Sequence, residues 1–233
     1  NSDGDFSDSG EDITAEVIDL QWRLGMAHPY KSVADDSSAQ IIVRNPSGTF
    51  SPELNSLLPG VRVRIQSHDG TTTRTHFTGI VAFVEPTTGE QQDNSAVIHL
   101  QDVLPWLAQS RVQIPPQLSV TADTVIEPII DEAIVRRAVI EGYCIIDVSG
   151  YNLIDSVSIF DDTNVARSLE TGKTTFAYIG DWWGDDVPAM QAIRELTDSE
   201  RGRFYVDRDG QLIFRNRHYT LITKTLSATF AAD

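Results

Sequence analysis

Three carboxylates flank a pair of tryptophans in the second half of the chain. Asp181, Asp185 and Asp186 surround Trp182 and Trp183. Clustered carboxylates supply the oxygen ligands that a hard cation prefers. An acidic residue just before a helix is more often its N-cap, and two large aromatics there more often make a hydrophobic contact. We therefore expect no metal site, and we name Trp182 and Trp183 as possible interface or glycan contacts.

Two short strings resemble fragments of ligand-binding loops. Residues 170–175, Glu-Thr-Gly-Lys-Thr-Thr, end like a phosphate loop, but Arg167 stands where that motif needs its first glycine. Residues 207–210, Asp-Arg-Asp-Gly, begin like a calcium loop but lack its later acidic ligand. Asp-Gly is also a common hairpin turn. We expect neither nucleotide nor calcium binding, and a β-hairpin at 207–210.

No other pattern in the chain makes a positive case for catalysis. The five histidines, His28, His68, His76, His99 and His218, have no metal-ligand spacing, and no Gly-x-Ser-x-Gly elbow occurs. The one cysteine, Cys144, lies in an apolar run and is expected to be a small buried hydrophobe. The prediction is a protein that is not an enzyme and binds no cofactor or metal. Glycosidase carboxylates leave no short signature, so a cell-wall hydrolase stays an alternative.

The charge balance narrows the classes of partner. The 233 residues include 34 acids and 18 bases, a formal net charge of −16. Binding to a nucleic-acid backbone needs Lys and Arg to displace counterions, so general DNA binding is not expected. An acidic surface serves solubility, or it lines a conduit through which DNA slides without sticking. No apolar run reaches the ~18 residues that span a bilayer, which predicts a soluble protein without membrane insertion.

The N-terminal residues 1–12 form an acidic segment. They carry Asp3, Asp5, Asp8, Glu11 and Asp12 and no basic residue. A signal peptide would have a basic region followed by an apolar run, so none is expected here. Ser, Gly and Asp dominate the segment, and we interpret it as a flexible or partner-dependent arm.

The elements that carry these residues fall into two groups. Residues 13–112 show short alternating strands about ten residues apart, which is typical of a β-barrel or sandwich. The expected strands are 13–24, 40–44, 61–65, 75–85 and 96–100, with turns at 45–48 and 68–71 and a short helix at 102–109 capped by Asp102. Gly79 inside the fourth strand indicates a bulge or bend. Pro115-Pro116 is expected to mark the boundary between the two halves of the chain.

Residues 113–217 are predicted to form a smaller α+β domain. Apolar residues at helical spacing predict a helix from Thr121 or Asp123 to Val135, and a second helix capped by Asp185 or Asp186 and ended by residues 200–202. Strands are expected at 143–148 and 157–160, followed by the 203–215 hairpin. Residues 218–233 are interpreted as a C-terminal strand that pairs with another subunit. The fold class is thus α+β, β-rich, with an N-terminal β-barrel-like domain.

Several segments together resemble the minor tail proteins of phages. The resemblance rests on 38–52, Ser-Ala-Gln-Ile-Ile-Val-Arg-Asn-Pro-Ser-Gly-Thr-Phe-Ser-Pro, on 58–65, Leu-Pro-Gly-Val-Arg-Val-Arg-Ile, and on 77–81, Phe-Thr-Gly-Ile-Val. The helix 189–196 and the hairpin 202–215 follow in the same order as in that family. The family is that of tail-tip hub or distal tail proteins.

The resemblance implies a structural role at the tail tip of a virion. Family members form a trimeric or hexameric ring that ends the tail tube and joins fibres or a spike, with tape-measure and tail tube proteins as partners and DNA as passing cargo. Assembly would take place in the host cytoplasm. This chain has room for one barrel and one α+β insert, so a second barrel is missing or comes from another chain. A carbohydrate- or receptor-binding tail module and a cell-wall hydrolase are the alternatives.

Overall fold

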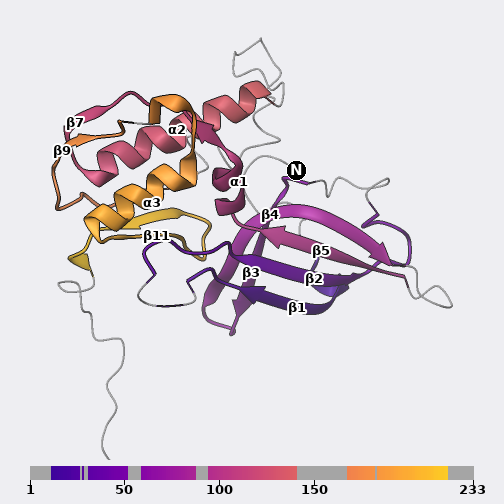
Figure 1. Cartoon of the computed structure of the whole chain (residues 1–233). Helices are drawn as coiled ribbons and strands as arrows, with labels where there is room; N and C mark the ends of the chain where they lie inside the picture. The colour runs from indigo at the N-terminus through magenta and orange to yellow at the C-terminus, as the bar shows by residue number, and fades with distance from the viewer. Residues whose placement is uncertain are drawn as a thin grey trace, which may run out of the picture.

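The computed structural model describes residues 12–26, 28, 31–51, 59–87, 94–140, 167–181 and 183–219, apart from the side chains of 134–140 and 185 (Figure 1). Several predictions fall outside this part: the arm up to residue 11, Cys144, the strands at 143–148 and 157–160, Trp182, and the C-terminal strand beyond residue 219.

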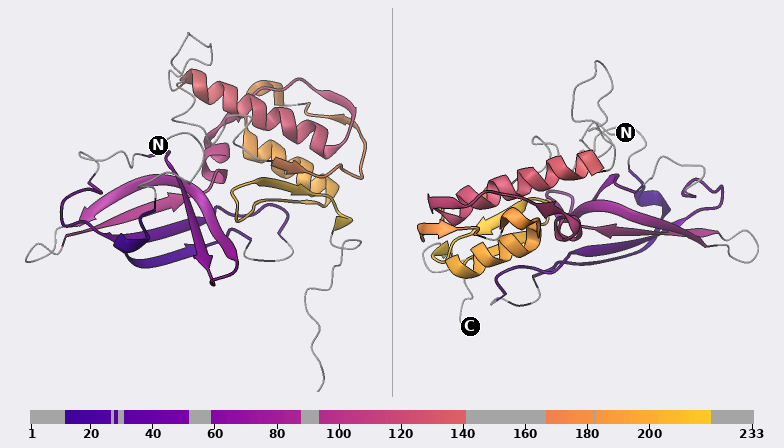
Figure 2. Two further views of the ribbon diagram at one scale, coloured as in Figure 1. Left: turned by 180° about the vertical axis from the view of Figure 1, so that it is seen from behind. Right: turned by 45° about the horizontal axis from the view of Figure 1, so that its top comes forward.

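The first half of the chain forms a curled, five-stranded antiparallel sheet with the order β1-β2-β5-β4-β3. Its strands are β1 (Val17–Arg23), β2 (Ser38–Arg44), β3 (Arg62–His68), β4 (Thr73–Thr87) and β5 (Ser95–Gln101). The sheet curves into a half-barrel, as Figure 1 and Figure 2 show from different sides. Among the described strands, β1 and β3 each have one partner, so both are edges. The expected barrel-like domain is therefore an open, curled sheet.

Strict alternation of side chains explains the core of this sheet. In β2 and β5 every second residue is buried, and the register places the two buried rows side by side. Each aliphatic side chain removed from water in this way stabilises the fold by about 1.5–3 kcal/mol. The buried cluster comprises Ala39, Ile41, Val43, Phe50, Ile65, Phe77, Val81, Ala96, Ile98 and Leu100.

Local irregularities distinguish the sheet from its prediction. Residues Thr14–Glu16 form a 3-10 turn, so the first strand begins at Val17 instead of residue 13. Gly79 is not itself displaced from the ladder; the register shifts lie on either side of it, in the β3–β4 and β4–β5 pairings. A Cβ on Gly79 would lie 2.4 Å from the carbonyl oxygen of Gln101, so glycine allows the two strands to approach.

In the second half, the described residues form three helices and three small sheets. The helices are α1 (Leu104–Gln109), α2 (Ala122–Ile140) and α3 (Ala189–Glu200), and a 3-10 turn covers Trp183–Asp185. The sheets pair β11 (Arg203–Val206) with β12 (Leu212–Arg215) and β8 (Arg167–Leu169), β10 (Val187–Pro188) with β6 (Arg111–Val112), and β7 (Gln117–Val120) with β9 (Phe176–Ile179). In Figure 1, α3 lies between α2 and the β11–β12 hairpin.

The helix boundaries differ from the sequence prediction at the start of α3 and at the end of α2. The helix that was expected to be capped by Asp185 or Asp186 begins only at Ala189, because Val187 and Pro188 pair with β6 as a short strand. Its end at Glu200 is confirmed, and Arg201 takes the left-handed C-cap position. Pro128 lies inside α2, which extends beyond the expected end at residue 135.

The two halves are joined by the segment between β1 and β2. Val33 forms a parallel bridge with Phe204 of β11. The Ala34 N–H donates to the Phe204 carbonyl over 2.9 Å, and the Phe204 N–H donates to the Ser32 carbonyl over 2.7 Å. Val33 and Ala34 also belong to the hydrophobic cluster of the second half, together with Val103 and other residues around α1. The domain boundary at residue 113 stays a prediction.

Candidate functional site

The loop that resembles a phosphate loop is filled by a carboxylate of the chain itself. The N–H of Lys173 donates to Oε1 of Glu200 over 2.9 Å, and the N–H of Thr174 donates to Oε2 over 2.7 Å. Adjacent backbone N–H groups form an anion-binding nest. Glu200 is fully buried at the end of α3, and hydrogen bonds from these N–H groups help to hold its pKa below the usual value despite the opposing effect of burial.

The same loop is also tied to α2 and to the end of β12. The N–H of Gly172 donates to Oδ1 of Asp123, in the first turn of α2, over 2.9 Å. Asn216 donates its side-chain amide to the Thr171 carbonyl and its N–H to Glu170. The loop therefore joins α2, α3 and β12, and its anion nest is occupied from within. No local sequence motif predicts this role of Glu200, because Thr174 and Lys173 precede it by 26 and 27 residues.

The predicted hairpin turn at 207–210 is confirmed. β11 and β12 pair from Arg203↔Arg215 to Val206↔Leu212, and Oδ1 of Asp207 accepts the N–H groups of Asp209 and Gln211. Asp207 is thus used to shape the turn. Within the described residues, no group of three or more His, Cys, Asp or Glu side chains is arranged to hold a metal ion.

The tryptophan pair does not provide the proposed contact surface at Trp183. Only 1% of Trp183 is exposed, and its indole N–H lies 3.3 Å from Oε2 of Glu195 as a hydrogen-bond donor. Trp183 packs in the core of the second half. A glycan cannot stack on a buried ring, so this suggested contact is corrected to a core residue; Trp182 lies outside the described residues.

Asp181 and Asp186, on either side of Trp183, have separate partners. Asp181 accepts the hydroxyl of Tyr178 over 2.7 Å, which raises the pKa of Tyr178. Asp186, at a φ of 68°, accepts the guanidinium of Arg111 on its carbonyl oxygen over 2.8 Å. These contacts attach the loop before α3 to β9 and β6.

The histidines of the sheet are likewise engaged separately. His76 contacts Ser67 over 2.7 Å and lies 5.1 Å, between ring centroids, from Trp22. His99 stacks on Phe83 at 4.2 Å between centroids. His76 and His99 share the sheet, as the sequence suggests, but their side chains have different neighbours: His76 lies near Trp22, and His99 lies beside the half-exposed Phe83.

The exposed apolar residues and the sheet edges are the surfaces best suited to partners. The edge strand β1 exposes 54% of Ile18 and 44% of Trp22. An edge strand with exposed apolar side chains is a template for pairing with another chain. On the second half, Leu118 of β7 and Tyr178 of β9 are direct cross-strand neighbours and are 66% and 51% exposed. The sequence alone did not predict that these four apolar side chains are exposed.

No α-helix in the described part of the chain is both long enough and apolar enough to cross a membrane.

Comparison with known proteins gives structural matches only. No protein-family model matches the chain. No curated protein matches it. Among solved structures, the tail protein from Neisseria meningitidis MC58 has 11% identity and a TM-score of 0.45, over 77% of this chain and 41% of that chain. The 43 kDa tail protein of prophage MuSo2 from Shewanella oneidensis has 10% identity and a TM-score of 0.47, over 84% of this chain and 51% of that chain.

A third structural neighbour is the c3393 protein of E. coli, described as a type VI secretion component similar to the T4 tail proteins gp27 and gp5. It has 14% identity and a TM-score of 0.45, over 85% of this chain and 49% of that chain. The chain therefore spans about half of the length of these structures, or less.

Proposed function

We propose that this chain is a structural, non-enzymatic component of the tail tip of a phage or phage-like particle. Copies of the chain form a ring that ends the tail tube and connects it to fibres or a spike, while DNA passes through as cargo. Support comes first from the sequence resemblance, which extends over most of residues 13–217. The ring is a trimer or hexamer, and its partners include the tail tube, tape-measure and fibre or spike proteins.

The structural observation that carries the proposal is the open sheet. Edge strands β1 and β3 end the same curled sheet on opposite sides. If β1 of one copy lies along β3 of the next, the contact is heterologous, and repetition of such a contact closes into a ring when the rotation permits. The bridge between Val33 and Phe204 then carries the α+β half along as part of the same subunit.

Electron microscopy of the purified chain tests the proposal. We expect rings at high protein concentration, and a larger mass by light scattering than that of one chain. Ile18→Lys, at an exposed position on β1, should abolish the rings because an inserted charge opposes edge pairing. Gln191→Lys, at an exposed position on α3, adds the same charge away from the sheet edges; it is the matched control and should leave them intact. A chain that remains monomeric at every concentration contradicts the ring.

The carbohydrate-binding alternative loses one of its two named residues because Trp183 is buried; Trp182 lies outside the described residues. Peptidoglycan zymography is the direct check on the hydrolase alternative, and a clear zone would contradict the structural role.

A further inference from the structure

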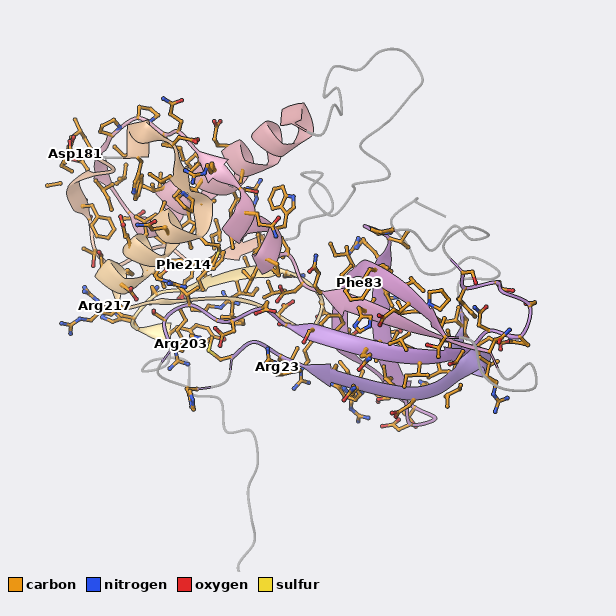
Figure 3. The ribbon with its side chains drawn as sticks, turned by 45° about the vertical axis from the view of Figure 1, so that its right-hand side comes forward. Arg23, Phe83, Asp181, Arg203, Phe214 and Arg217 are labelled. Carbon is orange, nitrogen blue, oxygen red and sulfur yellow. The ribbon has the colours of Figure 1, made fainter. Side chains whose placement is uncertain are left out.

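Four arginines cluster where α3 leads into the β11–β12 hairpin. Arg203 of β11 is the direct cross-strand neighbour of Arg215 of β12. Arg201 lies two residues before the start of β11, and Arg217 lies two residues after the end of β12. We name these four residues the arginine surface. Arg201 and Arg217 are exposed, and Figure 3 shows Arg203 and Arg217 along the same margin of the hairpin.

The arrangement is electrostatically unfavourable as it stands. Like charges placed directly opposite each other on a sheet destabilise the pairing. The hydrogen-bond and ring contacts of Arg215 are with neutral groups: Nη1 donates to Oγ of Ser168 over 3.2 Å, and the guanidinium lies 4.9 Å from the ring centre of Tyr219. Its charge also acts on Asp207, where it lowers the pKa of the carboxylate against the larger, opposite effect of burial. Its Nε is buried without a hydrogen-bond partner. A donor left in this way calls for an acceptor.

The nearby carboxylates do not neutralise the cluster. Glu200 directs both oxygens to backbone N–H groups, and Glu170 accepts the N–H of Asn216. Arg217 lies close enough to Glu200 to lower its pKa, but its recorded hydrogen bond goes to Oγ1 of Thr174, over 3.3 Å. Within the described part of the chain, no ion pair joins a carboxylate to Arg203, Arg215 or Arg217.

Guanidinium groups bind carboxylates through paired N–H donors, so the surface fits an acidic peptide. The chain contains one such peptide outside the described residues. Residues 1–12 carry five carboxylates and no Lys, Arg or His. Its charge is opposite to that of the arginine surface and of similar size.

The direction of β1 favours exchange between copies. The segment that follows Arg23 reaches Phe204, so the end of β1 points toward the second half and its start lies at the other end of the sheet. Figure 3 places Arg23 on the side of Arg203. The seven residues of β1 alone extend about 23 Å at ~3.3 Å per residue, so Asp12, which precedes β1, lies at the end of the sheet away from the arginine surface of the same subunit.

We propose that the acidic arm, residues 1–12, of one copy binds the arginine surface of a second copy. The partner identity rests on the proposed ring, which brings copies side by side. The arm then acts as a clasp whose strength falls with ionic strength, because the contact joins exposed charges.

The binding test uses full-length chains. In an arm-neutral variant, Asp3, Asp5, Asp8, Glu11 and Asp12 become Asn or Gln, which empties the surface. A fluorescent peptide of residues 1–12 should bind this variant at low salt. Adding Arg203→Ala and Arg217→Ala should weaken binding at least tenfold, while Arg44→Ala, an exposed arginine of β2, should not. Equal binding to the Arg203/Arg217 variant, or equal binding of an amide version of the peptide, overturns the proposal.

A mixing experiment decides whether a second copy receives the arm. The arm-neutral chain keeps its surface, and the Arg203→Ala/Arg217→Ala chain keeps its arm. Each alone should fail to cross-link through the arm, and the mixture should cross-link between the two kinds of chain. Absence of that product overturns exchange between copies. Rings that persist in micrographs of both variants would contradict the clasp and leave the proposed function intact. Peptide binding without rings would support the contact between the acidic arm and the arginine surface and would contradict the proposed ring.

Discussion

Ser37 and Asp102 hold each other through two hydrogen bonds inside the protein. The Asp102 N–H donates to the Ser37 carbonyl over 3.0 Å, and the Ser37 N–H donates to Oδ2 of Asp102 over 2.7 Å. Oδ1 of the same carboxylate accepts the N–H of Leu104 over 3.0 Å. Asp102 is 1% exposed. One buried carboxylate therefore joins the start of β2, the end of β5 and the start of α1, where the two halves meet.

Removal of this carboxylate should destabilise the whole chain. Asp102→Ala leaves the N–H groups of Ser37 and Leu104 buried without their acceptor. Each such loss costs about 1–3 kcal/mol, so we expect a decrease of about 2–4 kcal/mol in the free energy of unfolding, measured in urea. Asp36→Ala, at an exposed neighbour, is the control and should change stability by less than about 0.5 kcal/mol. Equal effects of the two changes would contradict the assigned role.

The charge of Asp102 should make stability depend on pH. Burial is the main cause that raises the pKa of Asp102 from 3.8 to about 6. The folded protein then holds the proton more tightly than the unfolded chain does. This contribution to stability is complete below about pH 3.8 and is lost as the pH rises through about 6, and its size is up to about 3 kcal/mol.

The comparison of the native chain with Asp102→Asn isolates this effect. Between pH 7 and pH 4, the native chain should gain about 2–3 kcal/mol relative to the variant. Other groups, such as Glu200 with its lowered pKa, act in the opposite direction but equally in both proteins. A stability difference that does not change with pH would rule out a raised pKa at Asp102.

The loop 170–174 should loosen when Glu200 is changed. Glu200→Ala removes the acceptor of two N–H groups, and we expect a loss of about 2–4 kcal/mol and faster proteolysis within the loop. Glu200→Gln keeps one acceptor oxygen, so its free energy of unfolding should fall by less than that of Glu200→Ala. Asp198→Ala, exposed on the same helix, is the matched control. Unchanged cleavage of the loop in the Ala variant would contradict this anchor.

The elements with local signals were predicted well from the sequence. The hairpin turn at 207–210 depends on Asp207 and Gly210, which lie only three residues apart. The turn at 45–48 is confirmed by the hydrogen bond from the Gly48 N–H to the Asn45 carbonyl. Alternation in β2 and β5 needs no distant information, because period-two patterns specify faces directly. Order and spacing of these elements also carried the resemblance to tail proteins.

Features that depend on distant partners were not predicted. α3 begins later than predicted because Val187 pairs in a β-ladder with Val112, which lies 75 residues earlier in the chain. Trp183 looked available beside its acidic neighbours, yet tertiary packing buries it. The opposition of Arg203 and Arg215 follows from the hairpin register, so it could have been found by aligning the two strands around the turn.

Trp183 should behave as a core residue. Trp183→Ala should lower the free energy of unfolding by about 3–5 kcal/mol because it leaves a large cavity. Trp183→Phe fills most of that space but loses the indole hydrogen bond to Glu195, so a smaller loss is expected. Thermal or urea unfolding measures both. Full stability of the Ala variant would contradict the buried position and return the residue to the list of surface contacts.

Gly25 should tolerate no side chain. A Cβ at Gly25 would lie 1.7 Å from the carbonyl oxygen of Asp35, whose own N–H donates to the Gly25 carbonyl over 3.0 Å. Backbone must move to relieve such an overlap, and the movement would disturb the segment that carries Val33 to Phe204. We expect Gly25→Ala to cost more than about 2 kcal/mol, with loss of protection from proteolysis between β1 and β2.

Gly184 provides the control for that substitution. A Cβ at Gly184 would meet nothing within 4 Å, so Gly184→Ala should be close to neutral. Because the Val33–Phe204 bridge joins the halves, Gly25→Ala should also let them unfold in two separate steps, whereas the native chain and Gly184→Ala unfold in one. A single transition of unchanged midpoint in Gly25→Ala would mean that the β1–β2 segment does not couple the sheet to the α+β half.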